Sequence, residues 1–107
     1  MAQLMLNPEI VDSPDLRRHI AERIEEIETV LPEGASLKVH LKRVSRHLFG
    51  ARLHSRLFGR EVVVRVYDAN IFHALNRARR HLLRQVDDVR HEKRDRIRLR
   101  HAKGRIS

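Results

Sequence analysis

The chain has 107 residues, of which 41% are hydrophobic and 35% are charged, and it contains no cysteine. This length fits one domain with a modest core, and the lack of cysteine excludes disulfide bonds and thiolate metal sites. The formal net charge is +9, so the chain is expected to bind a polyanion, either nucleic acid or, less in keeping with the sequence, an anionic membrane surface. No apolar stretch is long enough to span a membrane, and the first residues lack the basic start of a signal peptide. We therefore expect a cytoplasmic protein that has no membrane partner.

The first third of the chain predicts a strand followed by a helix. Residues 3–6 are mostly apolar and predict a short strand. Ser13, Pro14 and Asp15 are typical of a helix start, because they supply an N-cap, a fixed φ and a favourable charge. Apolar residues at helical spacing follow: Leu16, Ile20, Ile24, Ile27 and Leu31. Pro32 ends the predicted helix.

The middle of the chain changes to a period of two, in which apolar residues alternate with basic ones. Residues 36–43 and 51–57 follow this pattern, and residues 60–67 are β-branched, with Val62, Val64 and Val66 on one face and Arg65 and Tyr67 on the other. Such alternation predicts half-buried strands with one apolar face and one wet, basic face. Residues 45–50 are predicted to be a loop, and Phe58-Gly59 to be the turn of an antiparallel hairpin.

A second helix is predicted after a cap at Asp68 or Asn70. Its apolar stripe consists of Ile71, Leu75, Ala78, Leu82, Val86 and Val89. Beyond Val89 the helix is expected to leave the core. We therefore predict a domain of residues 1–94 and a flexible basic tail of residues 95–107. The order βαβββα favours an α+β fold, in which two helices pack on one face of a four-stranded sheet.

The basic residues gather in two predicted groups, both in the later part of the chain. Residues 1–35 carry three basic and eight acidic side chains, whereas residues 77–107 carry twelve basic and four acidic ones. The candidate nucleic-acid contacts on the second helix are Arg77, Arg80 and Arg84, extended by Arg90, Lys93 and Arg94. Those on the wet face of the sheet are Lys38, Lys42, Arg52, Arg56 and Arg65.

Two interpretations of these groups compete. Most charge runs are solvated faces that keep a protein soluble. Solvated helix faces usually mix signs, however, and no acid lies between Asp68 and Asp87, which favours phosphate binding. Tyr67 lies on the same sheet face, but one aromatic residue is too few for the stacking platform that proteins binding single strands use. Binding is therefore expected to depend on phosphate contacts and shape rather than on base stacking, and to weaken strongly with salt.

Catalytic and metal sites find no support in the residue pattern. The chain has eight histidines, and His40, His47 and His54 recur every seven residues, but no ligand motif joins them. There is no phosphate-cradling Gly-rich loop and no arrangement typical of a nucleophile and its base. We expect a protein that is not an enzyme and that has no cofactor, metal or small-molecule substrate.

Three segments resemble one known family, the short ribosome hibernation-promoting factors, also called ribosome-associated inhibitor or protein Y. The segment DSPDLRRHIAERIEEIE resembles the first helix of that family. The segment ARLHSRLFGREVVVRVYDANIFHALNRA resembles its hairpin and the start of its second helix, and Arg84-Gln85 matches a typical pair in that helix. The resemblance covers most of residues 3–94. One departure is Asp87-Asp88, which stands where the family is usually rich in lysine.

The resemblance implies a translation inhibitor that acts by binding. Such proteins occupy the channel of the small ribosomal subunit where mRNA and tRNA lie, in starved or stationary cells, and contact rRNA phosphates mainly through basic helix residues. The implied partners are the small subunit and whole ribosomes, with a monomer when free. A different class stays open, namely a free-standing basic module that binds double-stranded RNA or DNA.

Overall fold

The computed structural model describes residues 2–106, and the side chains of residues 2–92. The elements in chain order are β1 (Ala2–Leu6), α1 (Pro14–Val30), β2 (Ser36–Ser45), β3 (Leu48–Leu57), β4 (Arg60–Asp68) and α2 (Ile71–Ile106). The four strands form one sheet in the order β1-β2-β3-β4, with β1 parallel to β2 and the later strands antiparallel. The predicted βαβββα order and α+β class are confirmed.

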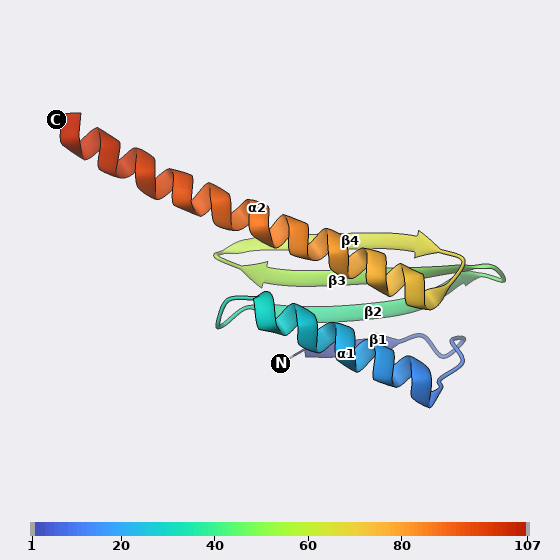
Figure 1. The fold of residues 1–107 in the computed structure, drawn as a ribbon. Helices are drawn as coiled ribbons and strands as arrows, with labels where there is room; N and C mark the ends of the chain where they lie inside the picture. The colour runs from blue at the N-terminus through green and yellow to red at the C-terminus, as the bar shows by residue number, and fades with distance from the viewer. Residues whose placement is uncertain (1, 107) are drawn as a thin grey trace.

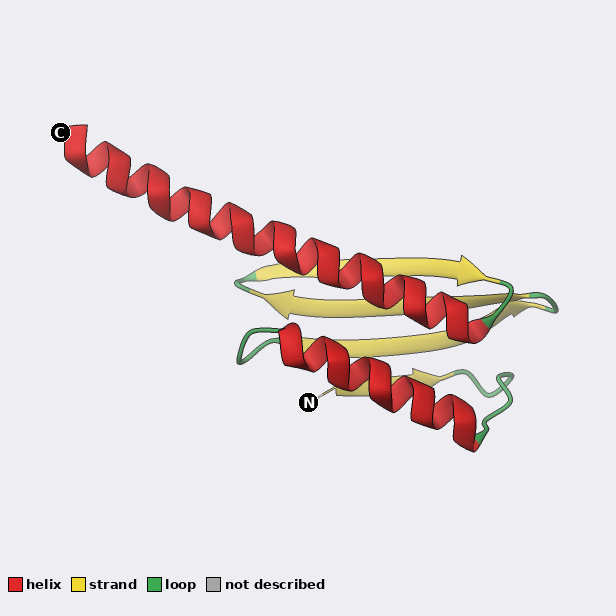
Figure 2. Ribbon diagram, in the orientation of Figure 1, coloured by secondary structure: helices red, strands yellow, loops and turns green. Residues whose placement is uncertain are grey.

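The protein has two layers, because both helices cover the same face of the sheet (Figure 1). Figure 2 shows α1 in front of β1 and β2, and α2 in front of β3 and β4. A parallel strand pair needs a long crossover, and α1 supplies it between β1 and β2. The inward side chains of the sheet and the apolar stripes of the helices form one core that includes Ile20, Ile27, Leu41, Leu53, Leu75 and Leu82. The opposite face of the sheet is left open.

Helix α1 begins and ends as the sequence predicts. The Ser13 hydroxyl accepts a hydrogen bond from the backbone N–H of Leu16 at 3.1 Å, and Pro14 occupies the first helical position. At the other end, the N–H of Leu31 donates to the Ile27 carbonyl at 3.1 Å. Ile20 is buried on the apolar stripe of this helix.

The sheet is longer than predicted at the turn between β2 and β3. The prediction of a loop over residues 45–50 is wrong, because β2 continues to Ser45 and β3 starts at Leu48. Only residues 46–47 form the turn, and the register shifts between Arg43 and Ser45. Large side chains and a glycine interrupt the apolar alternation in this segment. The strand forms there nevertheless, because its backbone pairs with β2.

The turn between β3 and β4 is the two-residue turn that was predicted. Phe58 and Gly59 both have positive φ, at 51° and 75°. Positive φ at both central residues is the requirement of a type I′ turn, whose twist matches that of the flanking strands. The tight turn fixes the register of the hairpin, so that Leu53 lies opposite Val64 and Arg52 opposite Arg65.

Helix α2 begins at an asparagine cap and extends past the sheet. Asn70 Oδ1 accepts hydrogen bonds from the N–H groups of Phe72 at 2.8 Å and His73 at 3.2 Å. The helix continues to Ile106, and Figure 1 shows its C-terminal part projecting beyond the strands. The division into a domain of residues 1–94 and a flexible tail of residues 95–107 stays a prediction. No helix within residues 2–106 is long and apolar enough to cross a membrane.

Candidate nucleic-acid interface

The open face of the sheet carries the predicted basic side chains. Strand alternation sends Leu37, Val39 and Leu41 of β2 into the core, so their neighbours in the chain point outward. The same rule applies to β3 and β4. The outer face includes Lys38, His40, Lys42, Arg52, His54, Arg56, Arg65 and Tyr67.

The strand register arranges these side chains in rows that cross the sheet. In the first row, Gly50 lies between Lys42 on one side and Tyr67 on the other. In the second row, Arg52 lies between His40 and Arg65. Basic residues directly opposite one another repel, so the Arg52–Arg65 pair lowers the stability of the sheet unless an anion lies between them. This end of the outer face is therefore suited to a phosphate.

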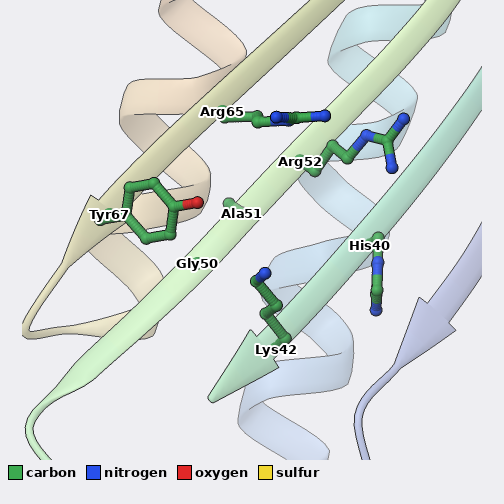
Figure 3. Close-up of a pocket in the computed structure, with 7 residues that line it drawn as sticks. All are labelled: His40, Lys42, Gly50, Ala51, Arg52, Arg65 and Tyr67. Carbon is green, nitrogen blue, oxygen red and sulfur yellow. The ribbon is translucent and has the colours of Figure 1, made fainter. Parts of the chain in front are cut away.

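A shallow hollow of about 250 Å³ lies at these two rows. Figure 3 shows its lining, with Tyr67 and Arg65 on β4, Arg52 on β3, and His40 and Lys42 on β2. Gly50 forms part of its floor, and a Cβ atom at this position would lie 3.2 Å from the Tyr67 ring. Because glycine has no side chain, the ring can lie close to the backbone of β3.

The predicted cations of the sheet are available to a ligand. Within residues 2–92, no hydrogen bond or ion pair engages these five exposed side chains, which are Lys38, Lys42, Arg52, Arg56 and Arg65. The outer face has an acid, Glu61, near the turn of the β3–β4 hairpin, away from Tyr67. Glu61 lies opposite Arg56, and its Oε2 is 3.9 Å from His54 Nε2. Solvated surfaces usually mix charges, whereas the Tyr67 end of this face is uniformly basic.

The arginine stripe of α2 divides into free and engaged members. Arg80 and Arg84 are exposed, and within residues 2–92 neither has a hydrogen bond or an ion pair. Arg77 is exposed too, but it donates to the Tyr67 carbonyl and to Asp68 Oδ2, both at 3.2 Å. The stripe lies on the helix layer and the hollow on the outer sheet face, so the two basic surfaces are on opposite sides of the molecule.

The other predicted contacts on α2 are placed differently. Arg90 donates to the carbonyl of Val30, where it caps the C-terminal end of α1 and complements the dipole of that helix. Nearby, Arg79 pairs with Glu26 of α1 at 3.1 Å. These two side chains join the helices. The side chains of Lys93 and Arg94 lie outside the described residues, so their role stays a prediction.

Asp68 links the hollow to the start of α2, and its ionisation affects stability. The backbone N–H of Asn70 donates to Asp68 Oδ1 at 2.9 Å and lowers the pKa of Asp68 below its ordinary 3.8, and the Arg77 side chain lowers this pKa further. Because the pKa of Asp68 is lower in the folded state than in the unfolded state, the ionised carboxylate stabilises the fold above pH 3.8. This stabilisation is lost as the pH falls through the folded-state pKa.

We therefore expect Asp68→Asn to reduce the acid sensitivity of the fold. Melting temperatures measured from pH 5 to pH 2 should fall less steeply for this variant than for the unchanged protein. The difference isolates Asp68, because the other carboxylates titrate in both proteins. Asp12→Asn, which removes the partner of Arg17 far from this site, serves as the matched control. Equal slopes for D68N and the unchanged protein would refute the assignment.

The sequence did not predict that His40, Gly50 and Tyr67 line one hollow of this interface. Alternation predicts Tyr67 on the wet face, but a lone aromatic gives no stacking signal. The predicted loop over residues 45–50 hides the position of Gly50 opposite Tyr67. Extending the alternation back through Leu48 would have revealed it. Within residues 2–92, no group of three His, Asp or Glu side chains is placed to hold a metal.

No protein-family model matches the sequence, and no curated protein matches it either. The fold itself is that of protein Y and of ribosomal subunit interface proteins. The N-terminal domain of protein Y from Thermus thermophilus has a TM-score of 0.68 at 20% identity, covering 83% of this chain and 99% of that one. A ribosomal subunit interface protein from Coxiella burnetii has a TM-score of 0.62 at 12% identity, covering 83% and 96%. The resemblance seen in the sequence motifs is thereby confirmed at the level of the fold.

Proposed function

We propose that this protein associates with ribosomes and inhibits translation by binding small-subunit rRNA in the channel that mRNA and tRNA occupy. The observation that carries the proposal is a pair of unengaged basic surfaces on opposite sides of a protein Y-like fold. One is the outer sheet face around Arg52 and Arg65, and the other is the α2 stripe at Arg80 and Arg84. The two similar structures, a protein Y domain and a ribosomal subunit interface protein, support the same proposal.

Two opposed basic surfaces suit a channel with rRNA on both sides. A protein that binds one duplex needs a single basic face, whereas one wedged between two RNA walls gains from phosphate contacts on each side. Arginine predominates on both surfaces, and its planar fork can donate two parallel hydrogen bonds to a phosphate. Occupancy of the channel would then exclude mRNA and tRNA sterically, so inhibition needs binding and no chemical step. The protein would act in the cytoplasm, as a monomer when free and without a cofactor.

The proposal predicts co-sedimentation with small ribosomal subunits, and a strong dependence of that binding on salt. With about six to eight phosphate contacts, affinity should fall by about a thousandfold to ten-thousandfold between 50 and 200 mM salt. The measurement is sedimentation of the protein with purified small subunits and with whole ribosomes over this range. An in vitro translation assay then tests whether the bound subunits are inactive.

A plain RNA duplex of similar length is the competitor that separates the two candidate classes. A ribosome-binding factor should prefer small subunits to the duplex at every salt concentration. If the protein stays at the top of the gradient at 50 mM salt, or prefers the duplex, the ribosomal proposal fails and the free-standing module takes its place.

A further inference from the structure

We propose that the hollow around Tyr67 is a subsite for one unpaired nucleotide of a single-stranded nucleic acid. The base would stack on the open face of the Tyr67 ring, and Arg52 and Arg65 would hold the adjoining phosphate. This inference deepens the proposed function and rests on it for the source of the nucleotide, which would be an exposed base of the channel. Such a subsite differs from a surface that binds any phosphate, because it requires an unpaired base.

The Tyr67 ring is placed as a stacking surface. It extends from β4 toward β3, and Figure 3 shows its face, rather than its edge, turned outward from the sheet. A Cβ atom at Gly50 would lie 3.2 Å from the ring, so one side of the ring lies against the strand. The residue is nevertheless 47% exposed. One side of the ring is therefore covered by backbone and the other is open, which is the arrangement that base stacking requires.

The neighbouring cations lie where the phosphate of a stacked nucleotide would reach. Arg65 is two residues before Tyr67 on β4 and points to the same side of the sheet, roughly 7 Å along the strand. Arg52 lies directly opposite Arg65, and Lys42 approaches the position of a Gly50 Cβ within 3.3 Å. These cations flank the ring on two sides. An anion between Arg52 and Arg65 would also relieve the repulsion within that pair.

A second hollow of about 300 Å³ continues the path across the sheet. It shares His40 and Arg52 with the first hollow and reaches Lys38 and Met5. The two together form a diagonal track that begins at the aromatic residue and leaves over β1. A strand of nucleic acid can follow this track with one base stacked and its backbone over the cations. A duplex cannot, because its bases are already stacked on one another.

The chain contains a single tyrosine and no tryptophan, so its tyrosine fluorescence comes from Tyr67 alone. We expect a short oligoadenylate, as RNA or as DNA, to quench this emission because the base stacks on the ring. The matched controls are a blunt RNA duplex and inorganic polyphosphate, which carry the charge without an unpaired base. These should bind through the same cations and leave the emission nearly unchanged. Equal quenching by polyphosphate and oligoadenylate would overturn the subsite.

Substitutions test the ring separately from the charge, with affinity read from the anisotropy of a labelled oligoadenylate. Tyr67→Phe should keep the affinity within about twofold, whereas Tyr67→Leu should lower it about tenfold, since a stacked base depends on the ring. Gly50→Ala should act in the same direction, because its Cβ would displace the ring. Val63→Ala is the matched control, since Val63 is an exposed apolar residue of β4 outside both hollows. Circular dichroism checks that each variant folds.

The same variants distinguish failure of the subsite from failure of the proposed function. If oligoadenylate quenches Tyr67 but the protein does not sediment with ribosomes, the subsite stands and the ribosomal proposal falls. If ribosomes bind the unchanged protein and Y67L equally and no single strand quenches the emission, the subsite falls and the ribosomal proposal stands. A loss of both oligonucleotide and ribosome affinity in Y67L, with Y67F unaffected, supports both.

Discussion

Replacing Arg65 with glutamate is expected to weaken binding to small ribosomal subunits about a hundredfold while raising the stability of the fold. The loss has two parts. Arg65 would no longer contact a phosphate, which is worth about 1.5–3 kcal/mol for a charged hydrogen bond. The new carboxylate would also attract Arg52, directly opposite, and repel the ligand. The stability gain comes from replacing a like-charge cross-strand pair by an opposite-charge pair, about 0.2–1 kcal/mol.

Arg56→Glu is the matched control for the stability change, because it makes the same charge change on the same sheet face. Arg56 lies opposite Glu61, so reversal there creates a like-charge pair and should lower stability. Binding is measured by sedimentation against salt, and stability by urea unfolding. The two variants should therefore move stability in opposite directions. If Arg65→Glu binds subunits as tightly as the unchanged protein, the outer sheet face is not the rRNA contact.

The general fold followed from periodicity, because each element has one buried face. Alternation in β2 and the stripe of α1 each specify which side chains enter the core, and the two-layer arrangement is the economical way to cover both. The segment 45–50 was the exception. Its pattern is weak locally and is sustained by pairing with β2, which is a tertiary effect that a single stretch of sequence does not contain.

The candidate site was predictable in composition and less so in arrangement. Alternation placed Arg52 and Arg65 on the wet face, but only the register of the hairpin shows that they lie directly opposite each other. The α2 stripe was predicted as one group, whereas Arg77 is engaged with Asp68 and Arg90 with the end of α1. The Arg90 contact reaches another helix and the Arg77 contact reaches back to the end of β4, so helical spacing within α2 carries no information about either.

Leu53→Ala is expected to destabilise the fold by about 2–5 kcal/mol without changing the affinity of the folded protein for RNA. Leu53 is fully buried at the centre of β3, between Val39 of β2 and Val64 of β4. Its truncation leaves a cavity that the surrounding sheet and helices cannot fill. Against a total stability of about 5–15 kcal/mol, this lowers the melting temperature by on the order of 10 °C or more. Thermal unfolding measures the change.

Comparing the Leu53 variant with one at the adjacent Arg52 tests which face of β3 enters the core and which binds RNA. Leu53 and Arg52 are neighbours in the chain, yet one points into the core and the other into the hollow. Leu53→Ala should change stability alone, and at low temperature the folded fraction should still bind subunits. Arg52→Ala should weaken binding and slightly raise the melting temperature, because it removes the repulsion between Arg52 and Arg65. Val63→Ala, an exposed truncation on β4, should cost less than about 1 kcal/mol. If L53A and R52A both lost binding only in proportion to the fraction unfolded, the effect of Arg52 would be structural. The outer sheet face would then have no direct role in binding.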